Sequence, residues 1–543
     1  MKDAWNFAQM DDYWRRYEPL TPWGQDHREA RRVLVDEKEI QDRHDDIDVA
    51  AQFLADAAAN PVSLDRLAYH LKRMPRLPLA EKDEYELIEL FQVKKFLANY
   101  RGVLSVLDDR TRGRFNLVPA CPGLAAELDR GGSDAETFYL ADSYDPGLGA
   151  CRASLAAIDA EIREARAASE ERAKVEFGLS FKGREFLVVA RSVFHEGAPD
   201  PVTFLIDPYD DGRVLVRLLP TGSAVAAMEK RERLLESERE AENAVIRRLS
   251  ALASKAMAEL RGAVAALTRW DIARAGAILA DQTASIRPEL DSSAMLLEEA
   301  RFVPCADECK ELGLEYHPLS ARFDSGAVVL FGSNMGGKTV ALKTMLFMQL
   351  LAQAGLFVPA RRFCSHVYRR VDYVGELAGE RLTGLSGFGF EIWRFQEAWQ
   401  RSEGALIAFD EPARTTGSHE AEALLSALVE AYANGRGARA FFATHFRGVA
   451  RVSGAEYRRM RGLDRAAACE ALDADAPLPE RLAGINRHMR YEIVDDDDAA
   501  QGESDALAIA TMLGLDCGLV ERAQDYFRKS LLPGSGAGVS TGH

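Results

Sequence analysis

Residues 332–339 read Gly-Ser-Asn-Met-Gly-Gly-Lys-Thr, which matches the phosphate-binding loop GxxxxGK[ST] in full. The apolar segment 327–331 precedes this loop and a helical pattern follows it, so the loop has the strand-to-helix setting that its chemistry requires. Its glycines let backbone N–H groups point at phosphate oxygens, and the start of the helix adds its positive end. The loop therefore predicts an α/β domain that binds a nucleotide.

Two side chains of this loop have specific expected roles. Lys338 is expected to reach the β- and γ-phosphates of ATP, and Thr339 is expected to ligate Mg²⁺. The residues expected to bind the nucleotide are Gly332, Ser333, Asn334, Met335, Gly336, Gly337, Lys338 and Thr339.

Polar residues also follow two further apolar segments, 405–409 and 438–443. Asp410 is expected to hold Mg²⁺, and Glu411 to polarise the attacking water as a general base. His445 has the position of a γ-phosphate sensor. Ser386 lies in a glycine-rich turn and is expected to present its hydroxyl to an anion. A surface strand end, a structural histidine and an ordinary glycine-rich turn are the alternatives.

The order of these motifs along the chain resembles that of ABC-type ATPases. Their amino-acid sequences are similar to the motifs of the MutS family of mismatch-repair ATPases. The similar segments are 332–339 (family GPNMGGK[ST]), 355–360 (GxxVPA), 385–391 (LSTF with a following Glu), 410–418 (DEIGRGTST), 442–446 (FATHY), His317-Pro318 (RHP) and 520–523 (VxxRA). The resemblance runs from about Tyr316 to Phe527. It implies Mg²⁺-dependent hydrolysis of ATP by a homodimer in which Ser386 of one chain completes the partner's site.

Composition changes along the chain predict an α+β multidomain protein. Its parts are a helical N-terminal region, a long helical lever tipped by a small β clamp, and a C-terminal ABC-type P-loop α/β ATPase domain. The expected boundaries are 1–130 for the helical region, 131–300 for the lever, 301–530 for the ATPase domain and 531–543 for a disordered Gly/Ser-rich tail. A freestanding coiled-coil spacer is the alternative interpretation of the lever.

Composition also excludes several classes of protein. The chain has 543 residues, and no run of 18 apolar residues that would cross a membrane. Seven thinly spread cysteines argue for a reducing cytoplasm, and Cys305 and Cys309 are expected to be idle thiols, with a metal pair as the alternative. The four carboxylates from Asp495 to Asp498 are expected to form a solvated loop, with a metal role as the alternative.

The target of the lever is left open by the sequence. Too few residues precede the lever for a mismatch-recognition module, and Pro412, Ala413 and Thr415 replace the usual Ile, Gly and Gly beside the Asp-Glu pair. Residues 177–221 carry five positive and six negative charges, which weakens the case for a grip on duplex phosphates. One hypothesis is action on branched or unusual DNA without mismatch recognition.

The other hypothesis is remodelling of a protein partner, since short MutS-like proteins resemble the reactivating ATPases of B12-dependent aminomutases. A structural dimer with a vestigial ATPase is a third alternative.

Overall fold

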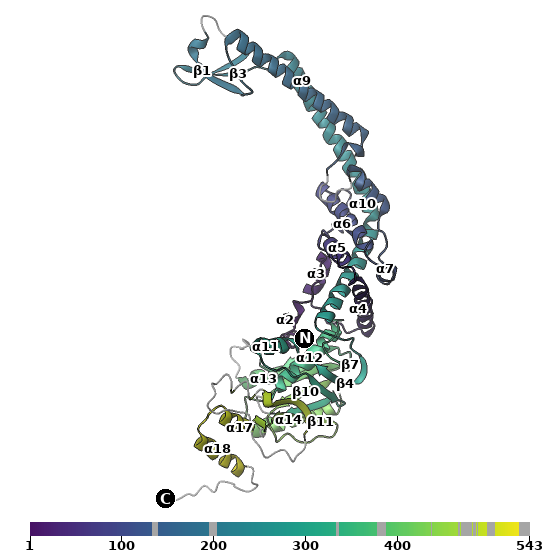
Figure 1. The fold of residues 1–543 in the computed structure, drawn as a ribbon, viewed down its shortest axis with the longest axis vertical. Coiled ribbons are helices and arrows are strands. Elements are labelled where there is room, and N and C mark those ends of the chain that lie inside the picture. The colour runs from purple at the N-terminus through teal and green to yellow at the C-terminus, as the bar shows by residue number, and fades with distance from the viewer. Residues whose placement is uncertain are drawn as a thin grey trace. The chain divides into compact units, whose positions relative to one another are not determined.

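The protein has an α+β fold (Figure 1). The computed structural model describes residues 1–132, 139–194, 203–332, 336–376, 387–435, 437–464, 467–468, 481, 485, 487–496 and 505–530. Its contacts divide the chain into two compact units. Unit 1 comprises Met1–Leu64, Asp108–Phe115 and Leu267–His543, and unit 2 comprises Asp65–Leu107 and Asn116–Ala266.

A six-stranded sheet with the order β12-β11-β6-β10-β9-β8 forms the centre of unit 1. The strands are β6 (Ala327–Phe331), β8 (Arg370–Val374), β9 (Ala405–Asp410), β10 (Arg439–Thr444), β11 (Ala455–Leu463) and β12 (Met489–Asp495). Neighbouring strands are parallel, except that β12 is antiparallel to β11 at one edge. Strands β6 and β10 are buried along their whole length, as expected of parallel strands that are covered on both faces.

Helices cover this sheet. Helix α12 (Lys338–Gln353) contacts β8, β9 and β10. Helices α13 (Gly387–Gln400) and α14 (Ser418–Ala433) pack into a core with β6, β9 and β10. Phe395 of α13 and Leu425 of α14 belong to that core.

The N-terminal helices also belong to unit 1, together with a small antiparallel sheet of order β5-β4-β7. Phe7 stacks on Tyr373 of β8 with ring centroids 3.8 Å apart, and Gln353 Nε2 donates to the carbonyl of Leu34 over 2.7 Å. These contacts join the N-terminal segment to the sheet and to α12. The elements are α1 (Lys2–Phe7), α2 (Met10–Trp14), α3 (Pro22–Glu29), α4 (Glu37–Ala57), α7 (Asp109–Phe115), β4 (Asp291–Ala300), α11 (Val303–Leu312), β5 (Leu319–Phe323) and β7 (Arg362–His366).

A buried carboxylate connects the N-terminal segment to the last turns of α10 (Gly222–Gln282). Asp271 has no exposed side-chain surface and forms an ion pair with Arg274. It also accepts hydrogen bonds from the backbone N–H groups of Leu20 and Thr21 and from the Thr21 hydroxyl. A carboxylate can remain charged inside a protein only with such a set of donors.

Unit 2 contains a long helix, a three-stranded antiparallel sheet and a longer helix, in that order. Arg152 of α9 (Pro146–Phe177) forms ion pairs with Glu238 and Glu242 of α10, each 2.7 Å long. The sheet, of order β1-β3-β2, lies at the end of α9 (Figure 1). Its residues Phe204 and Val216 share a core with Ala173 of α9. Its strands are β1 (Phe186–Ala190), β2 (Phe204–Pro208) and β3 (Arg213–Leu218). Unit 2 also contains helices α6 (Leu87–Leu104) and α8 (Pro122–Leu128). Helix α5 (Pro61–Lys72) begins in unit 1 and continues into unit 2. The last helices described in unit 1 are α17 (Asp505–Met512) and α18 (Cys517–Ser530).

Candidate active site

The candidate site lies at one edge of the six-stranded sheet, where β6, β9 and β10 end. These strands are parallel neighbours, and their register pairs Thr444 with Phe331 and Ala443 with Asp410. The residues that follow the three strands, Gly332, Glu411 and His445, are therefore brought to the same edge. This is the position at which open parallel sheets bind their ligands.

The structure describes Gly332 and residues 336–339 of the predicted phosphate loop, and the last two of these residues begin helix α12. Gly337 is the N-cap of this helix and has φ of 86°, a left-handed conformation that favours glycine. A Cβ atom at this position would lie 2.8 Å from Cδ1 of Tyr491, so glycine is also required by space. The expected ligands Ser333, Asn334 and Met335 lie outside the described residues.

Lys338, the first residue of α12, folds back over the loop. Its Nζ donates to the carbonyl of Gly332 over 2.7 Å, and its side chain is only 3% exposed. Burial lowers the pKa of Lys338 because the ammonium is removed from water. A phosphate group next to this buried ammonium would supply the compensating negative charge.

Thr339 and Asp410 form a pair of oxygen donors. The Thr339 hydroxyl donates to Oδ1 of Asp410 over 3.3 Å. Burial raises the pKa of Asp410, so the carboxylate gains from a nearby cation. A hydroxyl and a carboxylate at this separation fit Mg²⁺, which binds oxygen ligands and is commonly shared between one or two protein groups and substrate phosphates.

Glu411 stands between two other site residues. Its Oε1 lies 3.7 Å from Lys338 Nζ and 3.7 Å from His445 Nδ1. The backbone of Glu411 has φ of 51°, and its N–H donates to the carbonyl of Ala443 over 2.9 Å. A left-handed glutamate is uncommon, and such conformations gather at functional sites because the surrounding structure must hold them. The structure thus brings Lys338, Thr339, Asp410, Glu411 and His445 together.

Ser386 lies outside the described residues, immediately before α13. Glu391, which lies in α13, accepts a hydrogen bond of 2.7 Å from the Thr415 hydroxyl. Thr415 is one of the three residues at which this chain departs from the MutS motif, which usually has glycine here. The hydrogen bond uses the Thr415 hydroxyl, which glycine lacks.

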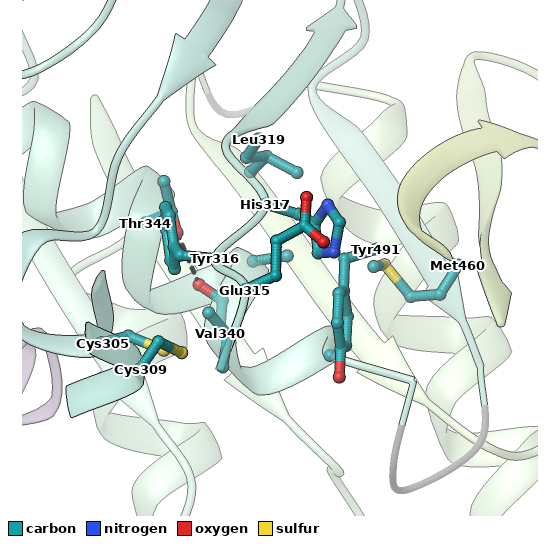
Figure 2. A pocket seen from close by; sticks show the side chains of 12 residues that line it. Cys305, Cys309, Glu315, Tyr316, His317, Leu319, Val340, Thr344, Met460 and Tyr491 are labelled. Atoms are coloured by element: carbon teal, nitrogen blue, oxygen red, sulfur yellow. Dashed lines mark hydrogen bonds between the residues drawn. The ribbon is translucent and has the colours of Figure 1, made fainter. Parts of the chain in front are cut away.

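A pocket that sequence reasoning did not predict opens beside the loop (Figure 2). It is a cavity of about 130 Å³. The rings of His317 and Tyr491 lie at one side, with centroids 5.7 Å apart, and Val340 of α12 lines the floor (Figure 2). The complete lining is Cys305, Cys309, Glu315, Tyr316, His317, Leu319, Gly337, Val340, Ala341, Thr344, Met460 and Tyr491. No local motif marks Tyr491, which reaches the pocket only because β12 joins the sheet.

The two pocket cysteines lie four residues apart on α11. Burial raises the pKa of the Cys305 thiol to about 11. Within the described ranges, no group of three or more His, Cys, Asp or Glu side chains is arranged to hold a metal ion.

The comparisons with known proteins agree with this geometry. Residues 328–529 match the family model for MutS domain V. An endonuclease MutS2 of Caldicellulosiruptor saccharolyticus is 23% identical over 480 residues, which cover 83% of this chain and 55% of that protein. An endonuclease MutS2 of Geobacillus thermodenitrificans is 26% identical over 400 residues, covering 70% of this chain and 46% of that protein.

A DNA mismatch repair protein MutS of Paracoccus denitrificans is also similar. It is 28% identical over 315 residues, covering 56% of this chain and 33% of that protein. The chain therefore spans about half the length of the two MutS2 relatives and about a third of the MutS protein. Among the helices described, none is long and apolar enough to cross a membrane. The match to domain V and these relatives support membership of the chain in the MutS family.

Proposed function

We propose that this protein is a Mg²⁺-dependent ATPase that uses ATP turnover to move a helical lever. The observation that carries this proposal is the convergence of Lys338, Thr339, Asp410, Glu411 and His445 at one sheet edge. Each of these residue types has a separate task in phosphoryl transfer, and their joint presence has no other evident purpose.

The roles follow from the chemistry of each side chain. The Lys338 ammonium binds the β- and γ-phosphates, and Thr339 and Asp410 hold Mg²⁺, which neutralises charge on the phosphates when bound. Glu411 orients the attacking water and accepts its proton. The imidazole of His445, 3.7 Å from Glu411, donates to the γ-phosphate. The backbone N–H groups of the loop and of the first turn of α12 complete the cradle.

The base of the nucleotide occupies the pocket in Figure 2 in this proposal. Gly337 and Val340 belong both to the start of α12 and to the pocket lining, so a nucleotide with its phosphates on the loop has this pocket within reach. The rings of His317 and Tyr491 offer flat faces against which a purine can stack.

The lever consists of α9, the three-stranded sheet and the part of α10 that lies in unit 2. Its salt-bridged helices form an extended element, and the last turns of α10 lie in the same unit as the site. A homodimer in which Ser386 completes the partner's site would couple nucleotide binding to movement of this element.

The lever acts on DNA without mismatch discrimination in our preferred version. This version is supported by the relatives, which carry the names endonuclease MutS2 and DNA mismatch repair protein MutS. Free thiols at Cys121, Cys151, Cys305, Cys309 and Cys364 accord with the reducing cytoplasm expected from the sequence.

One observation favours a protein partner as a second candidate. The three-stranded sheet β1-β3-β2 carries exposed apolar side chains, among them Phe186 and Leu205. These two residues pair in register with Arg217 of the central strand β3, one from each side. Exposed apolar groups around an arginine are typical of protein interfaces, whereas a duplex grip needs a basic excess. No relative named above refers to an aminomutase, so the identity of such a partner stays open.

The test is hydrolysis of ATP by the purified chain with Mg²⁺ and with EDTA. The variant Thr339→Val replaces the hydroxyl by a methyl group of similar size, and we expect it to lose most Mg²⁺-dependent turnover. Thr511→Val is the matched control, because Thr511 also lies on a helix, its hydroxyl donates to the Leu507 carbonyl, and it does not line the pocket. Equal rates with and without Mg²⁺ would refute the proposal.

A further inference from the structure

The loop that follows His445 contains two arginines that share one carboxylate. Arg447 Nη1 lies 3.2 Å from Asp496, and Arg451 forms an ion pair with the same side chain. Asp496 is only 6% exposed and follows the end of β12. The sequence predicts a solvated loop for the run from Asp495 to Asp498. For Asp496 this prediction is wrong, because its side chain is buried and two guanidinium groups compensate its charge.

Both arginines lie over the ring of Phe331. The guanidinium carbon is 5.1 Å from the ring centroid for Arg447 and 5.6 Å for Arg451. Phe331 is the last residue of β6 and is followed by Gly332, whose carbonyl accepts the Lys338 ammonium. The pair therefore lies at the end of β6, beside the residue that immediately precedes the phosphate loop.

The charges of this cluster do not balance. Two guanidinium groups face one carboxylate, which leaves a net charge of about +1 on these three side chains at neutral pH. Arg451 has a second aromatic contact, since its guanidinium lies 4.5 Å from the Tyr457 centroid. Arg447 is 49% exposed, and among the residues described its ion-pair partner is Asp496 alone. Most of its N–H donors thus remain available to a ligand.

The electrostatics of the loop agree with this placement. Burial lowers the pKa of Lys338, and the positive charge of Arg447 acts in the same direction, against the carboxylates of Glu411 and Asp410. Two cations near one loop repel each other until an anion lies between them. A bound phosphate would remove that repulsion.

We propose that Arg447 is a ligand of the terminal phosphate of the nucleotide within its own chain, with Asp496 holding the guanidinium in reach. Arg451 anchors the loop and does not contact the nucleotide. This inference rests on the proposed function, because it names a further ligand in the same site. It also distinguishes ATP from ADP, since only ATP carries the γ-phosphate that Arg447 would contact.

The experiment measures binding of ADP and of a non-hydrolysable ATP analogue by titration calorimetry at one fixed salt and Mg²⁺ concentration. We expect Arg447→Ala to weaken the analogue about tenfold, as loss of a charge-assisted hydrogen bond does, and to leave ADP nearly unchanged. Arg451→Ala is the matched control, because it removes a guanidinium from the same carboxylate and the same ring. It should not change the ratio of the two affinities.

Two other outcomes would overturn the inference. One is an unchanged affinity for the analogue in Arg447→Ala. The other is an equal loss for both nucleotides, which would make Arg447 an anchor like Arg451. If Arg447→Ala does not fold, Arg447→Lys keeps the charge without the fork, and an unchanged affinity ratio in that variant would also count against the inference. A wild-type chain that binds neither nucleotide would instead refute the proposed function.

Discussion

The hydroxyl Oγ1 of Thr339 lies 3.3 Å from Oδ1 of Asp410, although 71 positions separate the two residues in the chain. Thr339 is the second residue of the helix that follows β6, and Asp410 is the last residue of β9. Strand β10 lies between β6 and β9 in the sheet and is parallel to both, which brings the ends of all three to one edge. The pairing of these oxygens is thus a consequence of the strand order.

The buried carboxylate of Asp271 should be essential to the stability of unit 1. We expect Asp271→Asn to lower the free energy of unfolding by about 3–5 kcal/mol, because Arg274 would be left buried without its counter-charge. Chemical denaturation followed by circular dichroism measures this. Asp281→Asn, at an exposed position on the same helix, is the matched control and should change stability by less than about 0.5 kcal/mol. Equal stability of the two variants would contradict the assignment.

Stability should also fall in mild acid because of His44. Burial lowers the pKa of His44 from 6.5 to about 4, and its ring lies against Phe357. The unfolded chain therefore binds a proton below pH 6.5 while the folded chain does not until about pH 4, so the folded state loses about 1.4 kcal/mol per pH unit in that window.

The variant His44→Leu removes the titrating group. Thermal unfolding between pH 7 and 5 should show a smaller fall in Tm for this variant than for the wild type. His27, whose pKa burial also lowers to about 4, leaves a residual fall in both proteins. Parallel curves for variant and wild type would contradict the role of His44.

The proximity of the expected site residues follows from the sequence more directly than the position of the residues around them does. Lys338, Asp410, Glu411 and His445 follow apolar segments that are the strands β6, β9 and β10, and parallel strands must end at the same edge. Local patterns therefore suffice to bring those four residues near one another. The left-handed backbone of Glu411 has no signal in the sequence, since glutamate rarely adopts it.

Features that depend on distant contacts had no such signal. Tyr491 reaches the pocket from β12, a strand whose polar residues give no apolar pattern. In the sequence, Asp496 has the pattern of a solvated acidic run. Its ion pairs with Arg447 and Arg451 become visible only in the folded structure. The contact of Gln353 with Leu34 likewise joins segments whose association no local pattern encodes.

We expect the protein to bind matched and mismatched duplexes equally. The motivation is the charge of residues 177–221, where five positive and six negative side chains give no basic excess for a grip on a duplex. Both duplexes should be titrated at the same salt concentration, since phosphate contacts depend steeply on salt. A preference for the mismatch of about tenfold, or about 1.4 kcal/mol, would contradict the prediction.

The proposed composite site can be tested by mixing two inactive variants. Lys338→Ala and Ser386→Arg homodimers should each be inactive, because each has two damaged sites. A mixed dimer collects both lesions in one site and leaves the other intact, so hydrolysis should return, up to half the wild-type rate if the sites act independently. Subunit exchange is verified by native mass spectrometry. Activity of the Ser386→Arg homodimer alone would refute the shared site.

The central claim is that Glu411 is the general base of an ATP-hydrolysing site, and one paired measurement tests it most directly. Equilibrium ATP binding and steady-state hydrolysis are measured for the wild type, Glu411→Gln and Lys338→Ala. The account predicts that Glu411→Gln binds ATP as the wild type does while turnover falls by about 10²–10⁴-fold, and that Lys338→Ala loses binding. Hydrolysis by Glu411→Gln at the wild-type rate would contradict it.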